Sequence, residues 1–240
     1  MGSGYYFHVA NTWDNHLNIT TWAIGQSNST EVVNTIATID WAPKIPGLFN
    51  VGAGKWYVEG GVYHLFIPGS ITDSDHPSVY ETHALVSAGG ATCTTPACPF
   101  TFWSDPVSIT VDSANIYDPA VWKIGSTYYM WFTFGTASTD HWIYLASAST
   151  LLGPYTTIKS GDWAGWGNRK EGPTMYSTGP TSWRLAVEDI NSCFVSSCGL
   201  NPMKYSDCNT LDITACTWTS LQPWVEPFNF RHGSVLGPNY

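Results

Sequence analysis

The stretch Ser126-Thr127-Tyr128-Tyr129-Met130-Trp131 follows a glycine turn and combines aromatic with β-branched residues, which is the pattern of a half-buried β-strand. The same kind of strand recurs along the chain, at residues 4–9, 61–66, 126–131 and 182–186. A second kind of strand follows each copy, at residues 22–27, 82–87, 142–147 and 202–206. The repeat is roughly 55 to 65 residues long, which suits one four-stranded antiparallel sheet with its loops, as in a propeller blade.

Helical periodicity is almost absent from the chain, and 22 glycines and 15 prolines interrupt it every few residues. We therefore predict an all-β fold, a β-propeller that forms a single domain over residues 1–240. Residues 230–236 have the pattern of an inner strand with no complete blade after it, and we expect them to pair with the N-terminal strands and close the ring. A twisted β-sandwich with pseudo-repeats is the alternative architecture.

The composition narrows the functional classes. With 43% hydrophobic, 15% aromatic and 11% charged residues, the chain has ample apolar surface for a core, which excludes the disordered class. Its 13 tryptophans and 13 tyrosines exceed what a core needs and favour a binding surface lined with amphipathic rings. A net charge of −9 argues against nucleic acid and against an anionic membrane surface as partners. No apolar stretch approaches the roughly 18 residues of a membrane span.

Two carboxylates stand near the start of presumed inner strands, Asp118 in residues 116–121 and Glu171 in residues 170–175. The inner strand of a propeller blade lines the central channel. Hydrolysis of a glycosidic bond needs one protonated carboxylic acid and one ionised carboxylate, and a funnel of aromatic rings can separate their pKa values by desolvation. Asp118 and Glu171 are therefore the candidate catalytic residues. Asp-Pro and Glu-Gly-Pro are also ordinary turn signals, so a purely structural role is the alternative.

Aromatic and basic residues supply candidate substrate contacts. The loop at residues 162–167 contains two tryptophans and two glycines just before Glu171 and is placed to stack on a sugar ring, or else packs as an ordinary surface loop. The candidates for substrate binding are Trp166 in this loop, Trp13, Trp56 and Arg231. Gly-rich phosphate loops and the HExxH motif are absent from the sequence, which argues against phosphate and metalloprotease chemistry.

His232 is the candidate metal ligand. It lies between Arg231 and Gly233, from where it could reach into the central channel to hold an ion or a water molecule. A hydrogen-bonded core histidine is the alternative, and the sequence does not separate the two.

The six cysteines fall into close pairs, which indicates an oxidising compartment. Local pairing is the simplest connectivity, and zinc is the weaker alternative because the CxxC spacing is absent. Two glycosylation sequons, at residues 18–20 and 28–30, also fit a secreted, extracellular protein. The chain opens at residues 1–4 without a signal peptide, so we expect a mature form or a missing natural start. The predicted disulfides are Cys93–Cys98, Cys193–Cys198 and Cys208–Cys216.

Five stretches match one family pattern in order and spacing, at residues 116–122, 127–131, 153–155, 170–174 and 231–235. Residues 41–43 and 63–66 are looser echoes of the same pattern. Together they resemble glycoside hydrolase family 43, whose five-bladed propellers include arabinanases, α-L-arabinofuranosidases and β-xylosidases.

The resemblance implies a five-bladed propeller, and four blades with the ring closed by residues 230–240 is the alternative for a chain of 240 residues. It implies an inverting glycoside hydrolase that acts on arabinose- or xylose-containing plant cell-wall polysaccharide, as a monomer with no required cofactor. Glu171 would be the general acid, and Asp118 would orient it and tune its pKa. His232 would lie in the central channel near an ordered water or a metal ion, for which calcium is the candidate.

The general base is where the sequence departs from the family. The family places this Asp in an Asp-Pro strand directly before a strand like residues 4–8, and no Asp-Pro precedes those residues here. The nearest alternative carboxylates are Asp14, Asp40 and Glu59. A catalytically inactive propeller that binds polysaccharide through its aromatic funnel is therefore the second functional hypothesis, and a scaffold for protein interaction is the third.

Overall fold

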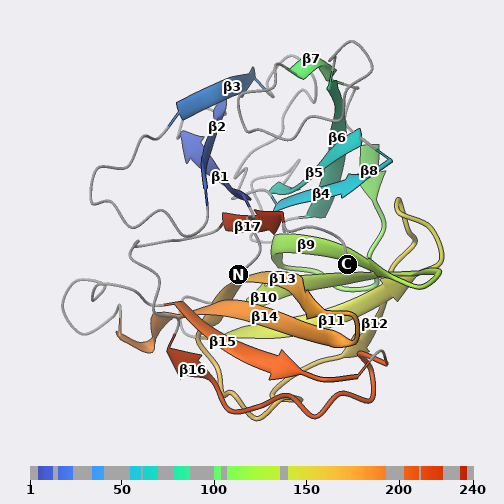
Figure 1. Ribbon diagram of the computed structural model, residues 1–240, viewed down its shortest axis with the longest axis vertical. Coiled ribbons are helices and arrows are strands. Elements are labelled where there is room, and N and C mark those ends of the chain that lie inside the picture. Colours follow the sequence, from blue (N-terminus) through green and yellow to red (C-terminus); the bar gives the residue numbers. More distant parts are fainter. Residues whose placement is uncertain are drawn as a thin grey trace.

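The computed structural model describes segments along the whole chain (Figure 1). The described residues are 5–12, 16–23, 34–40, 55–60, 62–69, 78–86, 100–103, 107–135, 140–192, 203–210, 212–223 and 233–236. The side chains that are described belong to residues between 55 and 223. Within the described part of the chain the helical structure is one 3-10 turn, η1 (Ile190–Ser192), which is far too short to span a membrane.

The described strands form four antiparallel sheets. Two sheets are built from the first half of the chain, and the last strand joins one of them. One has the order β17-β1-β2-β3, and its strands are β17 (Gly233–Leu236), β1 (Tyr5–Thr12), β2 (His16–Ala23) and β3 (Asn34–Asp40). The other has the order β4-β5-β6-β7 with β8 beside β6, and its strands are β4 (Lys55–Glu59), β5 (Val62–Gly69), β6 (Ser78–Val86), β7 (Phe100–Trp103) and β8 (Val107–Ile109).

The other two sheets follow in sequence order. The third consists of β9 (Ile116–Ile124), β10 (Thr127–Gly135), β11 (His141–Ala148) and β12 (Thr156–Lys159). The fourth consists of β13 (Lys170–Gly179), β14 (Ser182–Asp189), β15 (Met203–Cys208) and β16 (Gln222–Pro223). In each of these sheets neighbouring strands in space are neighbours in sequence, as in a β-meander.

The first strands of the four sheets meet in a cycle at the centre of the molecule (Figure 1). β17 contacts β4, β4 contacts β9, β9 contacts β13, and β13 contacts β17. The predicted closing strand is confirmed, because β17 pairs antiparallel with β1 from Tyr5↔Leu236 to His8↔Gly233. This circular contact of inner strands is the arrangement of a propeller and differs from two stacked sheets.

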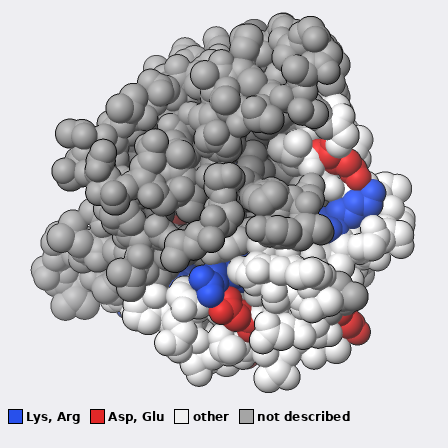
Figure 2. Space-filling view, viewed as in Figure 1, with Lys and Arg blue, Asp and Glu red and all other residues white. Residues whose placement is uncertain are grey.

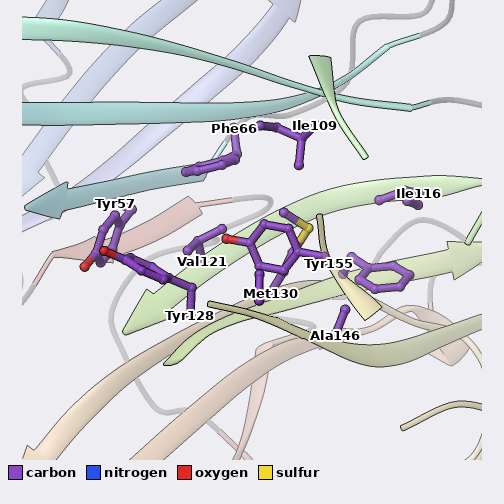
Figure 3. Close-up of a cluster of buried hydrophobic side chains, with 11 residues drawn as sticks. Tyr57, Phe66, Ile109, Ile116, Val121, Tyr128, Met130, Ala146 and Tyr155 are labelled. Carbon is purple, nitrogen blue, oxygen red and sulfur yellow. The ribbon is translucent and has the colours of Figure 1, made fainter. Parts of the chain in front are cut away.

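The third sheet is buried on both faces. Alternate residues of β10 point to opposite sides, so Met130 and Phe132 enter one core while Trp131 enters the other. The first core lies against the second sheet and contains the residues drawn in Figure 3: Tyr57, Phe66, Ile109, Ile116, Val121, Tyr128, Met130, Phe132, Ala146, Ala148 and Tyr155. The second core lies against the fourth sheet: Ala120, Trp131, Ile143, Leu145, Met175, Trp183, Leu185, Val187, Cys208, Ile213 and Trp218.

The predicted all-β, antiparallel fold is confirmed, and so is the repeat that predicted it. The four copies of the first strand pattern fall on β1, β5, β10 and β14, which each hold the second place in their sheet. The four copies of the second pattern overlap β2, β6, β11 and β15, the third strands. The repeat therefore reflects one supersecondary unit used several times.

One predicted disulfide is confirmed. Cys208, at the end of β15, is bonded to Cys216 across a loop whose Ile213 enters the second core. The pairs Cys93–Cys98 and Cys193–Cys198 lie outside the described residues. The bridge joins the last full strand of the fourth sheet to the loop that leads to Trp218.

Replacing both bridged cysteines, in a Cys208→Ala/Cys216→Ala variant, should lower the free energy of unfolding. Chain-entropy arguments give about 2.5 kcal/mol for a closed loop this short. Urea unfolding measures the loss, and Thr217→Ala is the matched control because Thr217 is exposed in the same loop. Equal stabilities of the double variant and the control would contradict the structural role of the bridge.

Candidate active site

Asp118 and Gly172 each lie at a β-bulge, just before a proline. In β9, Asp118 and Pro119 stand where β10 has the single residue Phe132, and the register shifts there. In β13, Gly172 and Pro173 likewise stand opposite Val187 alone. Both residues before proline have a positive φ, 50° for Asp118 and 59° for Gly172. The two turn signals of the sequence are therefore bulges inside the inner strands, which re-aim side chains there.

The two bulges are joined by a buried hydrogen-bond network. Oδ2 of Asp118 accepts the backbone N–H of Gly172 at 3.1 Å and the hydroxyl of Thr133 at 3.1 Å. The same N–H of Gly172 also points to Oγ1 of Thr133, at 3.2 Å. Asp118 and Thr133 are buried, so these bonds are not exchanged for water. Asp118 thus holds the backbone immediately after Glu171, and the structure brings the two predicted catalytic carboxylates together.

The carbonyl of Gly172 is held from the second sheet. Nζ of Lys55, the first residue of β4, donates to the Gly172 oxygen at 3.2 Å. Lys55 is only 1% exposed, and burial lowers its pKa to about 8, although the charges of Asp118 and Glu188 oppose the shift. A bulge leaves its peptide groups outside the strand ladder, so both groups of Gly172 find side-chain partners instead.

Gly172 is required here for space as well as for its backbone conformation. A Cβ at this position would lie 2.8 Å from Oε1 of Glu188, and φ is in the left-handed region that favours glycine. Glu188 is fully buried in β14 and is the ladder partner of Glu171. The charge of Lys55 therefore lies among the carboxylates of Asp118 and Glu188 beneath the bulge.

Glu171 points to a histidine of the neighbouring sheet. Nδ1 of His141, at the start of β11, forms an ion pair with Oε1 of Glu171. The two side chains are partly accessible, 17% for His141 and 15% for Glu171. The hydrogen bond to Glu171 raises the pKa of His141 against the effect of desolvation, and the charges of Glu171, Asp118 and Asp140 act in the same direction. Glu171 is thus more exposed to solvent than the buried carboxylates of Asp118 and Glu188.

Trp166 lies in a tryptophan cluster. Its indole N–H donates to the carbonyl of Thr219 at 3.2 Å, and its ring contacts those of Trp163 and Trp218. Trp163 stacks on the buried Trp131 and donates to the carbonyl of Ile143. Trp166 itself is partly exposed, so its role in substrate binding stays a prediction.

Four other predicted site residues lie beyond what the structure describes. Trp13, Arg231 and His232 are outside the described residues, and Trp56 is described in its β4 backbone but not in its side chain. Within the described residues no three His, Cys, Asp or Glu side chains gather into a metal site. The proposed metal ligand His232 and the calcium ion stay predictions.

Glu59 does not suit the role of general base. It ends β4, while Lys55 at the other end of that strand contacts the site, a separation of about 13 Å for four residues of strand. Oε1 of Glu59 accepts from Lys123 at 2.6 Å, and Oε2 accepts the Tyr128 hydroxyl at 2.8 Å. These bonds lower its pKa against desolvation. Figure 2 shows other places on this face where acidic and basic side chains lie side by side, although an acidic side chain at the lower right has no basic neighbour in this view.

The structure says less about the other two candidates for the general base. Asp14 is outside the described residues. Asp40 is the last residue of β3 and pairs with His16 in the ladder.

Sequence reasoning missed Lys55, His141 and Glu188. Two of them have a signal in hindsight: Glu188 ends the apolar run at residues 185–187, and Lys55 is one of nine basic residues and opens an apolar strand. Charged residues in such runs are buried only when they are paired. His141 had no such signal, because its partner lies 30 positions away in another sheet.

Comparison with solved structures identifies the architecture. An α-L-arabinofuranosidase from Lactobacillus brevis superposes with a TM-score of 0.55 at 15% identity, over 92% of this chain and 70% of that one. The GH43B protein of the xyloglucan PUL of Bacteroides ovatus gives 0.52 at 14% identity, over 92% of this chain and 38% of that one. An endo-1,4-β-xylanase from Bacteroides thetaiotaomicron gives 0.51 at 13%, over 90% and 70%.

The chain has the fold of these structures. The resemblance to glycoside hydrolase family 43 is thereby confirmed for the fold. At the level of sequence, no family model and no curated protein matches the chain. The structures supply the architecture, and the chemistry has to be argued from the residues of this chain.

The buried Lys55 should make stability depend on pH. Its folded pKa, about 8, is below the ordinary 10.5, so the folded state releases this proton first as pH rises. The contribution of the Lys55 pKa shift to the free energy of unfolding is fully present above pH 10.5 and is lost as pH falls through 8. It amounts to about 3 kcal/mol at most, since one pKa unit corresponds to about 1.4 kcal/mol.

Urea unfolding of the wild type and Lys55→Met at pH 7 and pH 10 measures this effect. At pH 7 the variant should be less stable by about 3 kcal/mol, because it leaves buried carboxylates and a carbonyl without their partner. The difference between the two proteins should grow toward pH 10. A difference that stays constant or shrinks would contradict the lowered pKa.

Proposed function

We propose that the protein is a glycoside hydrolase that cleaves glycosidic bonds in arabinose- or xylose-containing plant cell-wall polysaccharide or its oligosaccharides. The observation that carries the proposal is the link between the two inner strands. The buried Asp118 carboxylate binds the amide that follows Glu171, while Glu171 itself stays within reach of solvent. A general acid has to be accessible, as Glu171 is, and the carboxylate that orients it has to be fixed, as Asp118 is.

In the proposed reaction Glu171 is the general acid. Its carboxyl proton passes to the glycosidic oxygen, and the bond from that oxygen to the anomeric carbon breaks with its electrons staying on the oxygen. A water molecule adds to the opposite face of the sugar and gives its proton to a base, which inverts the configuration. Acid and base in such sites lie about 6.5–9.5 Å apart, so the base belongs across the channel from Glu171.

Asp118 positions the acid. It binds the main chain of Gly172, so it fixes the direction from which the Glu171 side chain leaves β13. Its negative charge also acts on the ion pair above it, because it favours the imidazolium of His141. Asp118 therefore acts through the backbone and through charge, and it does not touch the substrate in this proposal.

Further features belong to the same proposal. The described residues form four sheets whose inner strands meet in a cycle, which supports the four-bladed alternative with the ring closed by β17. The Cys208–Cys216 bridge supports an extracellular location, where disulfides persist. A carbohydrate is the proposed partner, bound by a secreted monomer of one domain, with Trp166 as a candidate platform.

Glu171→Gln should abolish sugar release from arabinan and arabinoxylan. The amide keeps the shape of the side chain but has no acidic proton, so the rate should fall by about 100-fold or more, as for a lost general acid. Reducing-sugar release by the purified wild type and variant measures this. Glu59→Gln is the control, because that carboxylate is bonded at the far end of β4.

Inactivity of the wild type on these polysaccharides would contradict the proposal that the protein is a glycoside hydrolase. If the wild type still bound them in affinity electrophoresis, the protein would instead be a carbohydrate-binding propeller.

Asp118→Asn should reduce the rate without preventing folding. The amide can still accept from Gly172 through its oxygen, but it loses the charge that strengthens the hydrogen bond and favours the His141 imidazolium. We expect kcat to fall by about 10- to 100-fold with little change in KM, as for a misoriented catalytic group. Steady-state kinetics tests this, and a rise in KM with unchanged kcat would indicate a substrate contact instead.

A further inference from the structure

We propose that His141 is the positioning residue of the general acid: it holds Oε1 of Glu171 and leaves the other carboxyl oxygen to deliver the proton. This inference rests on the proposed function, because it assigns the residue that orients the acid of that reaction. Neither the motif of residues 170–174 nor the resemblance of the sequence points to His141.

The geometry comes from two sheets. Glu171 is in β13, the inner strand of the fourth sheet, and His141 begins β11, the third strand of the third sheet. The ion pair between Nδ1 and Oε1 therefore crosses from one sheet to the next. On its other side the imidazole contacts the ring of Tyr117, at 6.3 Å between centroids. Both partners are mostly buried, so water does not easily replace the contact.

Gly135 makes room for the imidazole. It is the ladder partner of His141, and a Cβ on Gly135 would overlap the ring at Cδ2. The absence of a side chain lets the ring lie across β10 and reach Glu171. The position of His141 is therefore determined by its partner strand as well as by its own rotamer.

Three carboxylates act on His141 in the same direction. The charged groups that act on it among the described residues are Glu171 on β13, Asp118 on β9 and Asp140 just before its own strand. Each carboxylate favours the imidazolium over the neutral ring. These carboxylates thus favour a cation beside the proposed acid.

The imidazolium helps most when the proton leaves. The reactive form of the enzyme carries a protonated Glu171, which has taken its proton from solvent. In the reaction this O–H bond breaks, the proton joins the glycosidic oxygen, and Glu171 becomes a carboxylate beside the cation again. An imidazolium interacts more strongly with a carboxylate than with a neutral carboxyl group, so His141 stabilises the transition state more than the ground state. The gain is largest for substrates whose leaving group needs full protonation.

The role of His141 is therefore tested with substrates whose leaving groups differ in their need for a proton. The substrates are phenyl glycosides, whose leaving group needs a proton, and 2,4-dinitrophenyl glycosides, whose leaving group does not, of both arabinofuranose and xylose. His141→Gln should lower kcat on the phenyl glycoside by about 100-fold, as for a misplaced catalytic group, and change the dinitrophenyl rate only slightly. Gly135→Ala, which displaces the ring but keeps both partners, should show the same selectivity.

His64→Gln is the matched control. It is the same chemical change in β5 of the second sheet, where His64 contacts Tyr57, and it should leave both rates unchanged. If His141→Gln lowered both rates equally, or neither, the positioning role would be overturned while the proposed function stood. If the wild type cleaved neither glycoside, the proposed function would fail, and the role of His141 with it.

Imidazole titration by NMR tests the pair without any turnover. In the wild type His141 should titrate above its ordinary pKa of 6.5, and in Glu171→Gln its pKa should fall because the charged partner is gone. Glu59→Gln should leave the His141 titration unchanged. An equal His141 pKa in the wild type and in Glu171→Gln would overturn the ion pair and the proposal.

Discussion

The structure of the site depends on one peptide unit, Gly172, which side chains from two other sheets hold at both ends. Its N–H is bound by Asp118 and Thr133 of the third sheet, and its carbonyl by Lys55 of the second. A bulge removes these groups from the ladder of β13, and buried peptide groups without partners are costly. The bulge therefore persists because the neighbouring sheets complete it. Since Glu171 precedes Gly172, the direction of its side chain follows from that same constraint.

Burying charged side chains costs free energy, and grouping opposite charges in the site reduces that cost. Lys55, Asp118 and Glu188 are all nearly inaccessible, and each would be strongly unfavourable alone in a low-dielectric interior. Together they neutralise part of one another, yet the lowered pKa of Lys55 shows that desolvation still exceeds the attraction of the two carboxylates. Such clusters are weak stabilisers but determine geometry strongly, because any shift leaves a buried charge unpaired. A site that must hold one carboxylate in one direction benefits from that property.

Periodicity and motifs predicted much of this molecule. The alternating strand pattern around Tyr128 and its three other copies predicted the strands and the all-β fold class. This was possible because period-2 patterning is a local property of the sequence. Asp118 and Glu171 could be found because each is tied to a proline that breaks a ladder. The sequence marks Lys55 and Glu188 only as charges in apolar runs and does not mark His141 at all. The contacts of Lys55 and His141 could not be predicted, since their partners meet them only when separate sheets pack. The sequence indicates a turn at Asp118-Pro119, and the structure has a β-bulge there. A turn and a bulge can share the same local backbone conformation and differ only in how the strand pairs with its neighbour.

Because the site is shared among sheets, its chemistry is coupled to closure of the ring. β17 contacts both β4, which carries Lys55, and β13, which carries Glu171, while it pairs with β1 at the other end of the chain. A loss of that pairing would loosen β13, which contains the Gly172 peptide, and β4, which carries one of the three side chains that bind it. Misplacement of a catalytic group by about 1 Å can lower a rate about 100-fold. The pairing of β17 with β1 is therefore part of the geometry of the proposed acid, although no residue of β17 needs to touch a substrate.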